Sequence, residues 1–386
     1  MSRRGFTLLE LMTSMAITII ILLAVAASFT GIQSVYSREA QMKTAVESGR
    51  VATAYLERVA RYLGYGLDPR FAIDIGTTNL PSSTKTNFTG TGFITDDFAF
   101  RYRDPMYLRR GTFSGSAITL DSGTFGVALQ PGRLLQIVCP AGAAWAVVKT
   151  SVAVSAGDTT AAVASANVPA NPTSFPVPAA VATTPCMAGT GAKAPYVMLV
   201  REVRLRVVPL GPAGQQRPFL VAYNALDLSG TGTTATDFDP IAPDVESFHV
   251  SYVMNKDPAA ATPIDGSGGD WVLGNRAADS AKVPGVAALR PTYDDSYSDA
   301  VRYTNDAANV RAVQFELSTR SLRKESRMTH VQKRLADDPA AAVPSDGFFH
   351  VDVGTTVRAS NLTSRRTFTP LLKVSGDPTD LNEWGG

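Results

Sequence analysis

The chain opens with one long apolar stretch. Residues 11–37 carry no charged side chain, and at about 1.5 Å per residue a helix of this length reaches roughly 40 Å. That is long enough to cross a membrane with some tilt. One carboxylate, Glu10, stands directly before the stretch. A charge in hydrocarbon costs about 2.5–3.5 kcal/mol on insertion scales, so this carboxylate calls for a partner.

Beyond this stretch the pattern becomes that of a helix with one apolar face. Apolar residues recur at intervals of three and four, with a gap near Gly49, until Gly64 provides a stop signal. We therefore predict one helix over residues 6–66, apolar all round in 6–37 and amphipathic in 38–66. The predicted apolar stripe comprises Val35, Met42, Val46, Ala52, Leu56, Val59 and Leu63.

After the helix the period of the pattern falls to two. Phe98, Phe100 and Tyr102, for example, alternate with small or charged residues, which is typical of half-buried antiparallel strands. The predicted fold class is α+β, with the long N-terminal helix packed on an antiparallel β-sheet body over residues 67–386. The predicted strands lie near residues 98–103, 133–139, 203–207, 219–223, 248–254, 313–317, 348–353 and 368–374.

An Ala-, Pro- and Thr-rich insertion at residues 151–195 stands apart within this head. Within it, Ser151–Ser155 and Thr160–Ser165 are predicted to pair across a turn. The chain has two cysteines, Cys139 and Cys186. A disulfide between them is expected if the head lies outside the cytoplasm, and two unpaired core residues are the alternative.

Composition narrows the range of functions. The formal net charge is +2 over 386 residues, which gives no reason to expect a nucleic-acid partner. The three histidines are scattered, and no nucleophile, phosphate-loop or dinucleotide motif is present, so we expect no enzyme, no cofactor and no metal centre. Two weaker candidates are a Ca²⁺ loop at Asp265–Asp270 and a basic stretch at residues 320–334. We interpret both as solvated connections.

The six residues Gly5-Phe6-Thr7-Leu8-Leu9-Glu10 resemble the processing site of the type IV pilin family. The resemblance implies that residues 1–5 are a leader, which a prepilin peptidase removes between Gly5 and Phe6 before Phe6 is N-methylated. It also implies that Glu10 pairs with the terminal amine of a neighbouring subunit during assembly. Two alternatives are an ordinary secretory signal cleaved near residues 24–27 and a plain membrane anchor.

The distal half is similar to the PilW family of minor pilins. The similarity is carried by Ile241–Val253, Trp271, Val310–Ser321 and Arg365–Phe368, in that order. The tail after residue 374 departs from the Asn-Arg ending of that family, and the insertion has no counterpart in it.

The two resemblances together imply a minor pilin that primes assembly of a type IV pilus and sits in its tip complex. The implied partners are other minor pilins, the major pilin, a tip adhesin and the inner-membrane assembly platform. The implied location is the bacterial inner membrane, with the head in the periplasm, and then the pilus. A type II secretion pseudopilin of the GspJ type is the alternative, and a membrane-anchored periplasmic receptor is a third.

Overall fold

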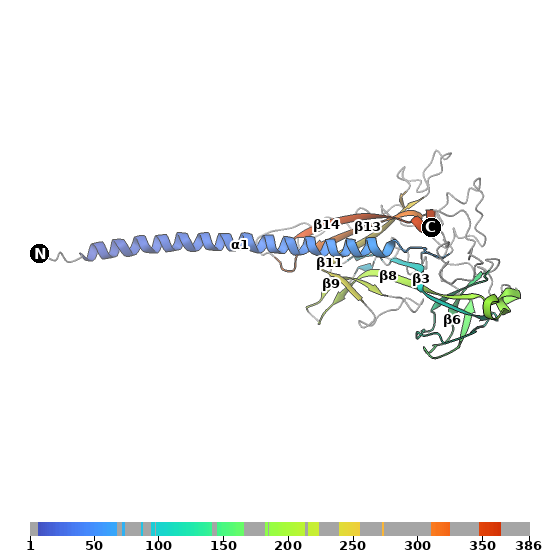
Figure 1. Cartoon of the computed structure of the whole chain (residues 1–386). Coiled ribbons are helices and arrows are strands. Elements are labelled where there is room, and N and C mark those ends of the chain that lie inside the picture. Colours follow the sequence, from blue (N-terminus) through green and yellow to red (C-terminus); the bar gives the residue numbers. More distant parts are fainter. Residues whose placement is uncertain are drawn as a thin grey trace, which may run out of the picture.

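The computed structural model describes residues 7–67, 72–73, 86–87, 94–96, 98–140, 145–165, 182–183, 185–212, 215–223, 239–254, 272–273, 310–324 and 347–363. A single rod-like helix projects from a head of β-strands, and the N-terminus lies at the far tip of the rod (Figure 1). This helix, α1, spans Leu8–Ala60, and its 53 residues measure roughly 80 Å at 1.5 Å per residue. Its buried positions begin only at Ala45, so the first half stands clear of the head.

The end of α1 is tied to the head by hydrogen bonds. Residues 61–66, which were predicted as helix, form turns. Gly64 adopts the left-handed conformation with a φ of 72°, which glycine reaches without steric cost. Its N–H donates to the Arg101 carbonyl at 2.9 Å, while the Asn361 amide donates to the carbonyls of Arg61 and Leu63. The carbonyls in the turns directly after the helix thereby gain hydrogen-bond donors from a distant segment of the head.

The described strands of the head form two sheets. One has the strand order β1–β2–β11–β13–β14, with β12 also paired to β11, and the other has the order β10–β9–β8–β3–β4–β7–β6–β5. Of the described pairings, only that of β2 with β11 is parallel, so the predicted class of a long helix on a mostly antiparallel body is confirmed. The strands are β1 (Thr86–Asn87), β2 (Ile94–Thr95), β3 (Phe98–Phe113), β4 (Ala117–Leu120), β5 (Leu134–Val138), β6 (Trp145–Thr150), β7 (Thr160–Ser165), β8 (Tyr196–Leu210), β9 (Arg217–Tyr223), β10 (Asp239–Pro243), β11 (Val245–Met254), β12 (Val272–Leu273), β13 (Val310–Arg320) and β14 (His350–Arg358).

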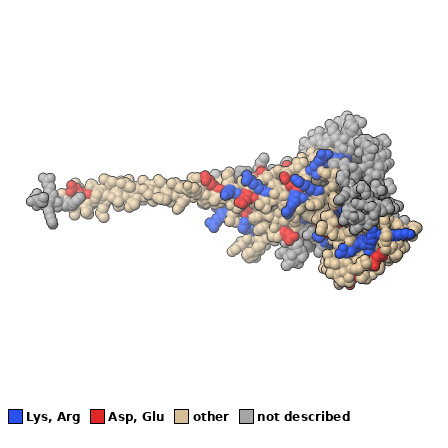
Figure 2. All heavy atoms as spheres, viewed as in Figure 1, with Lys and Arg blue, Asp and Glu red and all other residues tan. Residues whose placement is uncertain are grey.

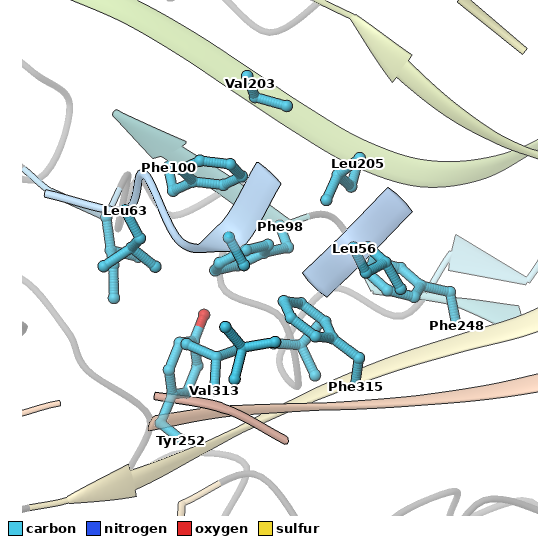
Figure 3. Packing of buried hydrophobic residues seen from close by; sticks show 14 of the residues in the cluster. Leu56, Leu63, Phe98, Phe100, Val203, Leu205, Phe248, Tyr252, Val313 and Phe315 are labelled. Carbon is cyan, nitrogen blue, oxygen red and sulfur yellow. The ribbon is translucent and has the colours of Figure 1, made fainter. Parts of the chain in front are cut away.

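The larger of two main cores lies between α1 and the facing sides of both sheets. Figure 3 shows Leu56 of α1 among side chains of β3, β8, β11 and β13. The Phe315 ring lies 5.6 Å from that of Phe98 and 6.1 Å from that of Phe248, measured between ring centroids. The residues in this core alternate along their strands, as the period of two predicts. The predicted strand at residues 368–374 lies outside the described residues.

The helix packs on the head through small residues, which the predicted stripe missed. Ala52, Leu56 and Leu63 are buried as predicted, but Val35 and Met42 are each 52% exposed. The buried positions are Ala45, Ser48, Gly49, Ala52, Leu56 and Ala60. A Cβ on Gly49 would lie 2.8 Å from Cγ2 of Val353 in β14. The gap in the apolar pattern is therefore a point of close approach between helix and sheet, because a larger residue there would hold them apart.

The far end of the head is a closed six-stranded barrel. Strand β3 pairs with β4, β4 with β7, β7 with β6, β6 with β5, β5 with β8, and β8 with β3, which completes the ring. Closure leaves no free edge in this ring, a common way for β proteins to avoid edge-to-edge association. The long strands β3 and β8 belong both to the barrel and to the sheet that packs on α1.

The barrel has its own core, and the disulfide lies beside it. Its filling residues include Phe113, Ile137 and Val197. Cys139, which follows β5, is bonded to Cys186 in the 3₁₀ turn Pro185–Ala188, with 5.9 Å between their Cα atoms. Met187 of the same turn is fully buried in the barrel core.

The described strand of the predicted insertion, β7, is built into this barrel. Thr160–Ser165 does form a strand, β7, but it pairs with β4 and β6. The predicted partner, Ser151–Ser155, is wrong as a strand. Its Val154 instead forms a single bridge with Leu129. A hairpin prediction considers only neighbours in sequence, whereas β7 is held on one side by a strand that precedes it by about forty residues.

Candidate functional site

The start of α1 is organised by a reciprocal cap between Thr7 and Glu10. The Thr7 hydroxyl accepts the Glu10 N–H at 3.3 Å, and Glu10 Oε2 accepts the Thr7 N–H at 3.1 Å and its hydroxyl at 3.0 Å. This is the capping box that a Thr-x-x-Glu sequence encodes, and the negative charge also suits the positive end of the helix dipole. The described hydrogen bonds to this carboxylate all end on Oε2, and Oε1 accepts none from the described residues.

The Thr7 cap is the functional element that the sequence reasoning missed. The signal was present, because a Thr three residues before a Glu at the head of an apolar run is the usual mark of a helix N-terminus. Glu10 therefore has a partner within its own chain, in addition to any that another molecule supplies. The two other predicted residues of this site, Gly5 and Phe6, lie outside the described residues.

The first half of α1 presents apolar side chains on all sides. Its large apolar residues from Leu8 to Ile32 are between 46% and 79% exposed. Figure 2 shows this half almost free of charged atoms beyond its acidic start, whereas charges gather on the second half and the head. Over the described residues, α1 is the helix that is long and apolar enough to cross a membrane, and no part of its most apolar window is buried.

The hydroxyl groups in this apolar half are satisfied within the helix. The Thr13 hydroxyl donates to the Leu9 carbonyl at 3.1 Å and that of Thr18 to the Ser14 carbonyl at 2.8 Å. Ser14, Ser28, Thr30 and Ser34 make the same kind of bond. Such back-bonding removes the need for water, so the surface is suited to lipid or to the apolar faces of other helices.

The weaker sequence candidates do not form a further site among the described residues. Asp265 and Asp270 lie outside them. In the basic stretch, Arg320 turns inward, with Nη1 2.7 Å from Glu246 Oε1 and the guanidinium 4.3 Å from the Phe348 ring centroid. The described part contains no group of three potential metal ligands.

Two of the histidines lie in buried pairs inside the head. His249 Nδ1 is 2.8 Å from Asp96 Oδ2, which also accepts the Val250 N–H at 2.9 Å. His350 Nδ1 lies 3.2 Å from Glu246 Oε2. The first pair joins β11 to the residue that follows β2, and the second joins β11 to β14.

The site is therefore the capped acidic start of a long apolar helix, set on a β-rich head, and this helix is long and apolar enough to cross a membrane. Residues 1–26 match a family described as the prokaryotic N-terminal methylation motif. The solved structures include a type IV-like pilin from Thermus thermophilus that is 14% identical, with a TM-score of 0.20, covering 60% of this chain and 85% of that one. No curated protein matches the chain. The chain thus carries a prokaryotic N-terminal methylation motif at the head of a long helix that packs on a mostly antiparallel β body.

Proposed function

We propose that this chain is a minor pilin of a type IV pilus, processed between Gly5 and Phe6. The observation that carries the proposal is the start of α1, where the methylation motif leads into a free apolar helix headed by a single carboxylate. The exposed helix and the motif are consistent with anchoring in a membrane and incorporation into a pilus.

The exposed side chains in the apolar half of α1 require an apolar environment. Burying one Leu, Ile, Phe or Met side chain stabilises by about 1.5–3 kcal/mol, and this half exposes more than ten such side chains. Lipid provides this environment while the subunit is in the inner membrane, before assembly. In the filament, the helices of neighbouring subunits replace lipid, in a head-to-tail assembly that can extend without closing.

Glu10 sets the register of that assembly. Its Oε2 is engaged by the Thr7 cap, and Oε1 is open to the N-methylated amine of Phe6 on a neighbouring subunit. An ion pair there neutralises both charges in an apolar environment, where a lone charge is costly. A helix placed out of register leaves both charges without a counter-ion, so the pair favours one stacking.

The head is the reason for assigning a minor rather than a major role. It carries a complete second module, the closed barrel, beyond the sheet that packs on α1. A head of this size crowds a shaft tiled with identical subunits but fits a few copies in a priming complex at the tip. The partners would then be other minor pilins, the major pilin, a tip adhesin and the assembly platform.

The test separates the charge of Glu10 from its capping role. Glu10→Gln keeps an oxygen acceptor for the Thr7 cap, since Gln also serves in a capping box, but it removes the charge. We expect Glu10→Gln and Glu10→Ala both to lower surface piliation by more than about tenfold, the effect of breaking a desolvated charge pair. Piliation is measured by shearing cells in which each variant replaces the native copy, and proteolytic resistance of the head serves as the folding control.

Normal piliation by Glu10→Gln would show that only the cap matters and would remove the ion pair from the proposal. Mass spectrometry of the sheared fraction supplies a second reading, in which the chain should begin at N-methylated Phe6. A chain that keeps residues 1–5, or one cut near Ala27, contradicts the proposal. Unchanged pili combined with lost enzyme export would assign the chain to type II secretion instead.

A further inference from the structure

Arg133 is a buried arginine, and two of its three guanidinium nitrogens make no hydrogen bond among the described residues. It directly precedes β5, and Thr150 fixes its backbone, because the Arg133 N–H donates to Thr150 Oγ1 at 2.9 Å and its carbonyl accepts the Thr150 N–H at 2.8 Å. The residue is only 9% exposed, and its Nε and Nη1 atoms are buried with no hydrogen bond in the described part of the chain. A buried charge without a partner is costly, so this arrangement calls for an explanation.

Arg133 lies where the two main cores meet. The β5–β8 register pairs Leu135 with Leu199, and extending it by two residues places Arg133 beside Arg201. On β8, Leu199 belongs to the barrel core, whereas Val203 belongs to the core that packs on α1. The junction between the two modules is therefore polar, and junctions of this kind are common places for binding sites.

A row of side chains connects this arginine to the end of α1. The β3–β8 register pairs Tyr102 with Arg201, on the same face of the sheet. The Tyr62 ring, just after α1, lies 5.4 Å from the Tyr102 ring between centroids, and Tyr62 is 46% exposed. The side chain of Arg201 is 39% exposed. The row therefore starts at the exposed Tyr62, continues through Tyr102 and Arg201, and ends at Arg133.

The carboxylates that act on Arg133 are already engaged by other arginines. Arg201 Nε donates to Asp104 Oδ2 at 2.6 Å, and Arg101 Nε donates to Glu202 Oε2 at 2.6 Å. Burial, followed by the positive charge of Arg201, lowers the pKa of Arg133 to about 10, so the side chain stays charged at neutral pH. Arg133 and Arg201 against Asp104 leave one positive charge in excess at the junction.

We propose that this junction, formed by Arg133, Arg201 and Tyr102, binds a single carboxylate, supplied by an acidic side chain of a partner protein. One carboxylate neutralises the excess charge, whereas a phosphate dianion would reverse its sign. The carboxylate would approach the 39% exposed guanidinium of Arg201, which can hold it through two parallel hydrogen bonds, while the buried Arg133 beside it supplies the excess charge. The site does not depend on whether the chain enters a filament, so it can be tested on the isolated protein.

The test uses the purified full-length chain in detergent micelles and a fluorescein-labelled hexaglutamate peptide, with binding followed by anisotropy. We expect saturable binding that Arg133→Met weakens at least tenfold. Arg109→Met is the matched control, because Arg109 also belongs to the barrel but donates to the Leu108 and Thr124 carbonyls at 2.9 and 3.3 Å. Equal weakening by both variants would indicate general charge attraction and overturn the site.

Two further readouts separate binding from a structural role. Removing an unpaired buried charge should leave the melting temperature of Arg133→Met unchanged or raised. A melting temperature lowered by several degrees together with unchanged peptide binding would make Arg133 a structural residue and refute the proposal. In competition, acetate should displace the peptide better than inorganic phosphate at equal ionic strength, and the reverse order would overturn the assignment to a carboxylate.

Discussion

At the scale of single residues, the structure uses polar groups in apolar surroundings in two ways. Thr7 and Glu10 satisfy one another at the start of α1, so the helix begins with its first polar groups paired. Tyr107 lies in the barrel core, only 6% exposed, and its hydroxyl makes no hydrogen bond in the described part of the chain. The first arrangement lowers the cost of a charge, while the second makes the barrel sensitive to alkaline pH.

Burial raises the pKa of Tyr107 to about 12 from the ordinary value near 10. The folded state therefore holds this proton more tightly than the unfolded state does. Stability from this group is complete below pH 10 and is lost as the pH rises towards 12. At pH 8 the free energy of unfolding of Tyr107→Phe should equal or slightly exceed that of the native protein. Between pH 8 and pH 11 the variant should lose about 1 kcal/mol less of this free energy than the native protein does. Urea unfolding at the two pH values measures this difference, and parallel losses in both proteins would contradict it.

At the scale of elements, periodicity predicted the type of each element better than its contacts. The period of two located β3, β8, β11 and β13, because apolar residues alternate with polar ones along much of each strand, even where both faces are buried. The predicted buried face of α1 was partly wrong, because Val35 and Met42 are more hydrophobic than Ala45 and Gly49. Close packing of a helix on a sheet instead selects small residues, whose apolar signal is weak.

The docking of α1 provides the prediction at this scale. Gly49→Leu places a bulky side chain where even a Cβ would approach Val353 Cγ2 to 2.8 Å. Overpacking of this kind costs about 1–3 kcal/mol, so we expect a lower melting temperature for the head and faster proteolysis after α1. Gly31→Leu is the control, because a Cβ there meets nothing within 4 Å. If the two variants melt alike, the small-residue contact does not determine docking.

At the scale of the whole molecule, the head is two modules that share two strands. The sequence predicted one β body with an insertion, because the barrel strands β4 to β7 show only short and weak alternation. Ring closure depends on pairings such as β5 with β8 that connect distant segments, and local patterns do not encode them. The junction residue Arg133 escaped prediction for the same reason, since a single arginine before a strand looks like a solvated side chain.

The disulfide tests how independent the two modules are. The bond between Cys139 and Cys186 spans 47 residues within the barrel region and stabilises by about 4 kcal/mol on the loop-entropy model. Reduction, or Cys186→Ser, should speed hydrogen exchange in β5, β6 and β7 and leave β11 and β13 protected. Mass spectrometry of exchanged peptides resolves these strands. A uniform loss of protection would show that the head unfolds as one unit.

The sharing of β3 and β8 has a mechanical consequence. A pulling load applied to the barrel reaches the sheet that packs on α1 through two covalently continuous strands, which pair with each other on both sides of a register shift between Arg103 and Leu108. The backbone of both strands, and no separate linker, would therefore carry such a load between the barrel and the rod.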